Sequence, residues 1–185
     1  MTEVLVAVAD GSEELETVTI VDLLRRAELA VTLAGTDSEM VRCSRGVCLV
    51  PDAALATVAR TGWDLVVVPG GSEGAARLAA EPALLEILAR QHDAGGPIGA
   101  ICAAPGVLAE AGVLDGRRAT AFPGTLEARG LKSTGAAVEV DGSVITSRGP
   151  GTAIDFALAL IATLTTSERR DRVAAGLQRE PAVPA

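Results

Sequence analysis

The chain has 185 residues, and 49% of them are hydrophobic, but it contains only one Trp, two Phe and no Tyr. This length predicts one domain, residues 1–185, and the hydrophobic content excludes disorder for the body of the chain. Sixteen Lys and Arg stand against 24 Asp and Glu, which gives a net charge of −8. Because so acidic a chain cannot neutralise a phosphate backbone, we expect no nucleic-acid partner.

The apolar stretches are interrupted by charged residues or glycine before they reach the roughly 20 residues that a membrane span needs, so we expect no membrane partner. The first residues, MTEVLVAVADG, lack the basic region of a signal peptide. Three cysteines without CxxC spacing and a single histidine predict neither a secreted disulfide framework nor a metal site. These features predict a cytoplasmic protein without a bound metal. The scarcity of aromatic residues favours a shallow pocket for a small ligand, so no cofactor is expected either.

Short apolar runs bounded by Gly, Pro or Asp predict buried strands, because parallel strands are covered on both faces. An Asp-Gly turn predicts a hairpin between the last two strands, and a second hairpin is expected around residues 47–50. The predicted strands are Val4–Ala9, Ala30–Ala34, Val47–Val50, Leu65–Val68, Ile98–Ile101, Arg118–Ala121, Val138–Val140 and Val144–Thr146.

A helix is predicted over Glu13–Ala27, where Leu15, Val18, Val21 and Leu24 recur at three-residue steps as one apolar stripe. The chain ends in a Pro-containing tail, which we expect to be flexible from about residue 178. Helices alternating with strands predict an α/β fold, a mostly parallel sheet with helices on both faces. The further predicted helices are Ala75–Ala80, Pro82–Ala94, Pro105–Ala111, Thr152–Leu164 and Glu168–Leu177.

Chemically interesting residues follow three of these strands, at the sheet edge where ligands gather in open α/β sheets. Cys102 lies at a sharp change from strand to helix, where helix N–H groups favour a thiolate. A small buried side chain is the competing interpretation of Cys102, since free cysteines are often buried. Gly70 and Gly71 could present backbone N–H groups to an oxyanion, or could form a plain turn. Glu16 could hydrogen-bond the sulfur, or could be a solvated residue that complements the helix dipole.

The chain resembles the ThiJ/PfpI superfamily, and most closely the branch of the parkinsonism-associated protein deglycase and bacterial YajL. Five motifs in the same order carry the resemblance, which reaches to about Thr165. They are DGSEELETVTIVDLLRRA (10–27), VRCSRGVCLVPDAAL (41–55), VVVPGGSEGA (66–75), GAICAAPGVLA (99–109) and TSRGPGTAIDFALAL (146–160). The resemblance implies a flavodoxin-like three-layer sandwich and a homodimer with contacts through the first helix.

The resemblance also implies roles for individual residues. Cys102 would be the reactive cysteine and Glu16 the carboxyl group that holds it. The thiol would be surrounded by Gly70, Gly71 and Ala103, with the last two as backbone donors. Two further residues match positions near the family's pocket, namely Arg45, which the dimer partner could contribute, and Pro150. Cys43 matches a second, peripheral cysteine of the animal relatives, whereas Cys48 does not align with their third.

One departure bears on mechanism. Many superfamily hydrolases pair the cysteine with a histidine, but Phe122 stands in that neighbourhood here. The only histidine, His92, falls late in a predicted helix. A Cys-His dyad is therefore not expected, which argues against peptidase and class I amidotransferase mechanisms.

Two functional hypotheses follow from the resemblance. In the first, Cys102 attacks small 2-oxoaldehydes or glycated adducts, as a cofactor-free glyoxalase, a protein or nucleotide deglycase, or both. In the second, the protein is a non-enzymatic redox sensor or chaperone in which peroxide converts Cys102 to sulfinic acid. The two hypotheses share one thiol and are compatible.

Overall fold

The computed structural model describes residues 1–36, 39–59 and 61–178. Seven strands form one sheet in the order β5-β2-β1-β6-β7-β9-β8, and all neighbours are parallel except β8 and β9. The predicted flexible tail falls, apart from residue 178, on residues 179–185, outside the described part. In sheet order the strands are Ala53–Ala54 (β5), Ala30–Gly35 (β2), Glu3–Val8 (β1), Leu65–Val68 (β6), Ile98–Ile101 (β7), Val144–Ser147 (β9) and Val138–Asp141 (β8).

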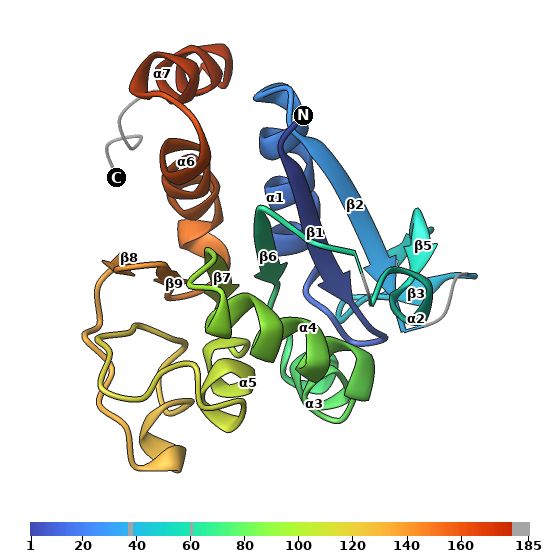
Figure 1. Ribbon diagram of the computed structural model, residues 1–185, viewed down its shortest axis with the longest axis vertical. Helices are drawn as coiled ribbons and strands as arrows, with labels where there is room; N and C mark the ends of the chain where they lie inside the picture. The colour runs from blue at the N-terminus through green and yellow to red at the C-terminus, as the bar shows by residue number, and fades with distance from the viewer. Residues whose placement is uncertain (37–38, 60, 179–185) are drawn as a thin grey trace.

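Helices cover both faces of this sheet (Figure 1). One face carries α1 (Glu14–Arg26), α6 (Ala153–Leu164) and α7 (Ser167–Gly176). The other carries α2 (Leu55–Val58), α3 (Ser72–Ala79), α4 (Pro82–Asp93) and α5 (Pro105–Glu110). The predicted α/β class and flavodoxin-like sandwich are confirmed.

Strand β1, which has a neighbour on each side, shows why the apolar runs are continuous. Val4, Val6 and Val8 pack on the α1 and α6 side, while Leu5 and Ala7 pack on the α3 to α5 side. All five are fully buried, because successive side chains of a strand point to opposite faces. The sequence therefore needs apolar residues at every position of this strand after the exposed Glu3.

A short antiparallel hairpin lies apart from the main sheet. Its strands are β3 (Val41–Arg42) and β4 (Cys48–Leu49), which confirms the hairpin predicted around residues 47–50. Two single turns of 3₁₀ helix, Glu127–Arg129 and Pro150–Thr152, complete the secondary structure of the described residues. Within the same residues, no helix is both long and apolar enough to cross a membrane.

The apolar stripe predicted for the first helix is wrong at Leu15 and Val18, whereas Val21 and Leu24 do pack against the core. Leu15 is 52% exposed and Val18 is 48% exposed, whereas Ile20 and Leu24 are fully buried. Steps of three residues fall progressively behind the helical repeat of 3.6, so Leu15 and Val18 rotate away from the sheet. The side that packs on the sheet begins instead with Glu16, a fully buried carboxyl group.

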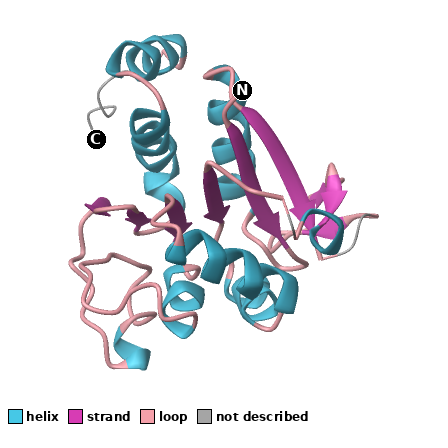
Figure 2. Cartoon of the chain, in the orientation of Figure 1, coloured by secondary structure: helices cyan, strands magenta, loops and turns pink. Residues whose placement is uncertain are grey.

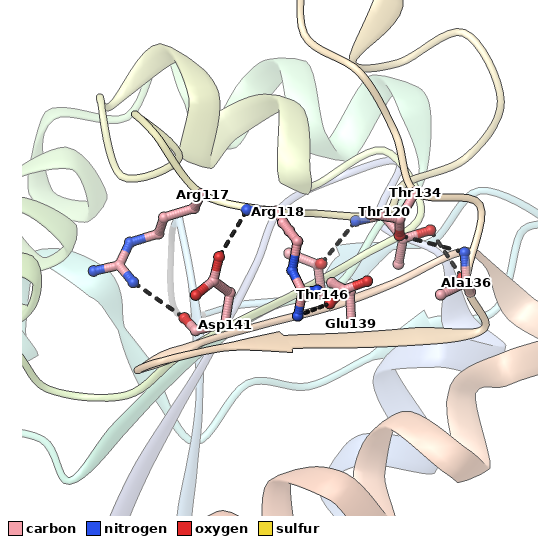
Figure 3. Close-up of polar contacts among 8 residues, drawn as sticks. All are labelled: Arg117, Arg118, Thr120, Thr134, Ala136, Glu139, Asp141 and Thr146. Carbon is pink, nitrogen blue, oxygen red and sulfur yellow. Dashed lines mark hydrogen bonds and ion pairs between the residues drawn. The ribbon is translucent and has the colours of Figure 1, made fainter.

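The predicted strand Arg118–Ala121 is also wrong, because side chains rather than a ladder of backbone bonds satisfy this segment (Figure 3). The N–H of Arg118 donates to the Asp141 carboxylate at 2.8 Å, and the N–H of Thr120 donates to the Thr146 hydroxyl at 2.9 Å. Only one isolated bridge, from Ala119 to Ser133, resembles strand pairing. Figure 2 shows the stretch between α5 and β8 mostly as loop.

Candidate active site

Cys102 follows directly after β7 with a positive φ of 64°, a conformation that is strained for a residue other than glycine. Two backbone hydrogen bonds hold it. Its N–H donates to the Ser147 carbonyl at 2.9 Å, and its carbonyl accepts from the Phe122 N–H at 2.8 Å. Backbone strain that neighbouring strands and loops hold in place is typical of a functional residue. It favours a reactive Cys102 over the alternative of a small buried side chain without a chemical role.

Glu16 lies in the first turn of α1 and is fully buried. Its Oε2 accepts a hydrogen bond of 2.7 Å from the N–H of Gly70. The same carboxyl group interacts with the thiol of Cys102. Its Oε1 has no hydrogen bond of normal geometry within the described residues. Glu16 is therefore not a solvated helix-dipole residue, and it faces the sulfur with one oxygen free.

Gly70 is glycine for a steric reason. A Cβ at this position would lie 2.5 Å from the Cβ of Cys102 and 2.7 Å from Oε2 of Glu16. Gly71 has a φ of 90°, and a Cβ there would lie 2.2 Å from the carbonyl oxygen of Gly11. Both glycines are thus required by close approach rather than by a plain turn.

The pKa values of the two reactive groups are raised. Burial raises the pKa of Glu16 to about 7, against the opposing effect of its hydrogen bond from Gly70. Burial, followed by the nearby Glu16 carboxylate, raises the pKa of the Cys102 thiol to about 12. Hydrogen bonds from the N–H groups of Gly71 and Ala103 act in the opposite direction. Burial and Glu16 outweigh these two donors, so the pKa of the Cys102 thiol lies above its ordinary value.

A pocket of about 380 Å³ opens over the thiol. Cys102, Gly71 and Ala103 line its floor, and Arg45, Phe122 and Pro150 also line it. The chain's own Arg45 reaches this pocket, so no partner chain is needed to bring an arginine there. Phe122 is 52% exposed at the pocket, where it presents an aromatic side chain in place of a histidine.

Glu14 positions the part of the pocket wall that carries Arg45, a role that the sequence analysis did not identify. Its buried carboxylate accepts hydrogen bonds from the Ser44 hydroxyl at 2.9 Å and from the Arg45 N–H at 2.8 Å. Although burial opposes ionisation, these bonds together with backbone N–H groups lower the pKa of Glu14. The available signal was an acidic residue in the first turn of a helix combined with a tight Ser-Arg-Gly turn elsewhere.

The remaining candidate residues lie away from the pocket. His92 is in the last turn of α4 and does not line the pocket. Cys43 is a buried residue of the turn between β3 and β4, where burial raises the pKa of its thiol to about 11, and Cys48 is exposed. Among the residues that the structure describes, no group of three or more His, Cys, Asp or Glu is arranged to hold a metal ion.

Comparison with known proteins agrees with this geometry. The model of the DJ-1/PfpI family matches residues 2–163. The chain belongs to the DJ-1/PfpI family. It is 43% identical over 178 residues to the protein dj-1beta of Drosophila melanogaster, an alignment that covers 94% of this chain and 95% of the relative.

Two other members of the DJ-1/PfpI family inform the functional argument. The "glutathione-independent glyoxalase DJR-1.2" of Caenorhabditis elegans is 38% identical over 162 residues, covering 86% of this chain and 87% of that protein. A solved structure described as "Toxoplasma gondii DJ-1, oxidized" has a TM-score of 0.92 and 39% identity, and covers 98% of this chain and 100% of that one. The resemblance inferred from the five motifs is confirmed.

Proposed function

We propose that this protein is a cysteine-dependent enzyme that needs no cofactor and removes reactive carbonyl compounds, in the manner of a glyoxalase or a deglycase. The observation that carries the proposal is the buried Cys102 thiol beside the buried Glu16 carboxyl group, both of which pack against Gly70. A carboxyl group with a pKa of about 7 is suited to both accepting and donating a proton near neutral pH. A relative named as a glutathione-independent glyoxalase adds family-level support.

The proposed chemistry starts from the neutral thiol. As the sulfur bonds to the aldehyde carbon of a 2-oxoaldehyde, the Glu16 carboxylate accepts the thiol proton and passes it on to the aldehyde oxygen, which gives a hemithioacetal and leaves Glu16 ionised again. Transfer of the C1 hydrogen, as a proton, to C2 oxidises C1 and reduces C2, so the hemithioacetal becomes a 2-hydroxy thioester. Water then cleaves the thioester, which releases the 2-hydroxy acid and restores the thiol. The sum is 2-oxoaldehyde plus water to 2-hydroxy acid, which consumes neither oxidant nor reductant.

The other pocket residues have supporting roles in this proposal. The N–H groups of Gly71 and Ala103 stabilise negative charge at the sulfur or at the developing oxyanion. Arg45 and Pro150 shape the opening, and Arg45 offers the ketone oxygen a cationic partner. For a glycated amine or thiol, the same attack by Cys102 on the adduct carbon would release the amine or thiol instead.

The test measures methylglyoxal consumption together with lactate formation. We expect Cys102→Ser to lose at least 10³-fold in kcat/KM, because a hydroxyl is a far weaker nucleophile than a thiol at neutral pH. Two control variants, Cys48→Ser and His92→Ala, alter residues outside the pocket and should keep the wild-type rate. Lactate production by purified Cys102→Ser protein at an undiminished rate would overturn the proposal.

A second candidate function is redox sensing through the same thiol, either alone or in a chaperone-like role. It is favoured by the free Oε1 of Glu16, because a protonated carboxyl group with a pKa of about 7 can donate to a sulfinate oxygen. A family member solved in a state described as oxidized is consistent with this candidate. Mass spectrometry of peroxide-treated protein should find two added oxygens on Cys102 before Cys43 or Cys48, and the reverse order would exclude it.

We also propose that the protein is a cytoplasmic homodimer that pairs through α1 and the adjacent hairpin. The supporting observation is a set of apolar side chains at or near α1 and the β3–β4 hairpin, each about half exposed or more. These are Leu15, Val18, Met40, Val47 and Val50. Burial of such side chains against a second copy would remove apolar area from water.

A further inference from the structure

Phe122 gives the reactive pocket an exposed aromatic side chain that the catalytic steps proposed above do not use. The chain has three aromatic residues, and the other two lie elsewhere. Phe156 is fully buried in the core, while Trp63 packs against the core and lines a different hollow beside α4. Phe122 is 52% exposed and lines the pocket together with Cys102. A large apolar ring gains free energy when a ligand covers it, so this wall favours a ligand with an apolar face.

Backbone hydrogen bonds fix Phe122 relative to the reactive residue. Its N–H donates to the Cys102 carbonyl at 2.8 Å, and its own carbonyl accepts from the Thr125 N–H at 3.0 Å. One edge of the ring lies against Gly149, where a Cβ would come within 3.6 Å of Cδ2 of Phe122, an ordinary van der Waals distance. Pro150, the next residue, lines the same pocket. The ring therefore has support on one side and belongs to the same small wall as the thiol.

The charged side chains around the pocket do not favour a cationic partner for this ring. The lining contains two carboxylates, Glu13 and Glu73, and one guanidinium, Arg45. Glu73 forms an ion pair of 2.7 Å with Arg77, and the Glu13 carboxylate accepts the N–H of Glu16 at 2.7 Å. The two arginines balance the two carboxylates, so neither sign of charge dominates. A neutral group is the partner that suits the ring best.

A 2-oxoaldehyde that carries an aromatic ring fits both the mixed lining and the size of the pocket. The hydroxyl groups of Ser72 and Thr125 share the lining with Phe122 and suit the two carbonyl oxygens of such a molecule. Phenylglyoxal has ten heavy atoms, which occupy at most about 300 Å³ if each takes the volume of one water molecule in the liquid. The pocket of about 380 Å³ can hold this molecule. Methylglyoxal, with half as many heavy atoms, has no ring to place against Phe122.

We infer that Phe122 determines the specificity of the Cys102 pocket, where its ring stacks on an aromatic group of the molecule that reacts with the thiol. The proposed enzyme then prefers aryl to alkyl 2-oxoaldehydes, a preference that rests on the proposed function. In phenylglyoxal the ring is attached to the ketone carbon, next to the carbon that bonds to sulfur, so both rings lie in one pocket. A stacked or edge-to-face pair of rings strengthens binding by a factor of about 2 to 10 beyond the effect of the buried area.

The experiment compares kcat/KM for phenylglyoxal and cyclohexylglyoxal, which are similar in size but differ in aromaticity. The intrinsic reactivities of the two aldehydes are the same for every variant, so a change in their ratio reports on the pocket. We expect the phenyl-to-cyclohexyl ratio to fall at least twofold in Phe122→Leu, which keeps an apolar side chain, and to keep its wild-type value in Phe122→Tyr. The matched control is Val140→Ala, a half-exposed apolar position on β8 outside the pocket, which should also keep the ratio. A wild-type ratio in Phe122→Leu would overturn the inference.

A second readout separates this inference from the proposed enzyme activity. Benzyl and cyclohexylmethyl methanethiosulfonates convert a thiol to a mixed disulfide and release methanesulfinate and a proton, and peptide mass spectrometry follows the rate at Cys102. If no 2-oxoaldehyde is consumed but Phe122→Leu selectively slows benzyl labelling, the enzyme proposal fails while the ring-binding role of Phe122 stands. If Phe122→Leu labels with wild-type selectivity, the role assigned to Phe122 is wrong, whatever the turnover.

Discussion

Glu14 and Glu16 lie two residues apart in the first turn of α1, and their surroundings move the pKa values of their carboxyl groups in opposite directions. Glu14 accepts several hydrogen bonds from the hairpin, which lower its pKa despite burial. Glu16 accepts one hydrogen bond, from Gly70, and burial raises its pKa to about 7. One carboxylate is thus held ionised to fix a wall of the pocket, while the other is held near its titration point beside the thiol.

The first prediction concerns stability against pH. The pKa of Glu16 rises from 4.5 to about 7 on folding, so the native state binds this proton more tightly than the unfolded chain does. Its contribution to the free energy of unfolding is therefore full below pH 4.5 and is lost as pH rises to about 7. The loss is about 3 kcal/mol. Glu16→Gln, which cannot ionise, should remove this decline in urea titrations at pH 5 and pH 8.

The matched control for this measurement is Glu86→Gln, the same change at an exposed position of α4. It should show the wild-type difference between the two pH values. A Glu16→Gln protein whose stability still declines like that of the wild type would show that Glu16 is not the titrating group.

The second prediction concerns the pH dependence of turnover. If the Glu16 carboxylate accepts the thiol proton, kcat/KM for methylglyoxal should rise with pH through an apparent pKa of about 7 and then level off. Glu16→Gln should lose at least 100-fold in kcat/KM and also lose this inflexion. A rise in rate that continues up to the pKa of the thiol, with no step near neutrality, would instead point to direct attack by preformed thiolate.

Much of this site could be predicted from its residue types together with the rule that ligands bind at the carboxyl ends of parallel strands. Cys102, Gly70 and Gly71 each follow a run that is apolar enough to be a buried strand. Glu14 could not be predicted in the same way. Its role depends on a hairpin 30 residues away folding back over the helix, and neither segment alone encodes that approach.

The wrong predictions about the fold also arise from contacts between segments that are distant in the sequence. The segment Arg118–Ala121 has the composition of a strand, but the Asp141 and Thr146 side chains take up its N–H groups. Leu15 and Val18 have the spacing of a buried stripe, but both are about half exposed to solvent. The neighbouring Glu16 carboxyl group is buried instead. In both cases tertiary contacts outweigh local pattern. Charged Glu16 at a core position is the kind of conflict expected at a functional site.

The third prediction concerns Glu14 as a positioning residue. Glu14→Gln replaces one acceptor oxygen by an amide that faces the N–H donors of the Ser44–Val47 turn. We expect a loss of about 1–3 kcal/mol in stability at pH 7 and a rise in KM for methylglyoxal, with a smaller change in kcat. Because the pKa of Glu14 is lowered on folding, its contribution is full above pH 4.5 and is lost as pH falls further. The stability gap between variant and wild type should therefore narrow in acid, and a gap that widens there would contradict this role.

The last prediction concerns the exposed apolar side chains of α1. Leu15 and Val18 lie one turn apart on the side of the helix that faces away from the sheet, and both are about half exposed. If a second copy covers them, Leu15→Glu together with Val18→Glu places two carboxylates in an apolar contact and should convert a dimer to a monomer. Sedimentation velocity at micromolar concentration measures the change.

The matched control is Ala89→Glu on α4, an exposed position far from the hairpin in sequence, which should leave the sedimentation coefficient unaltered. Since all residues that line the Cys102 pocket come from one chain, a monomeric variant should still contain this pocket. A wild-type protein that sediments as a monomer would contradict the proposed assembly.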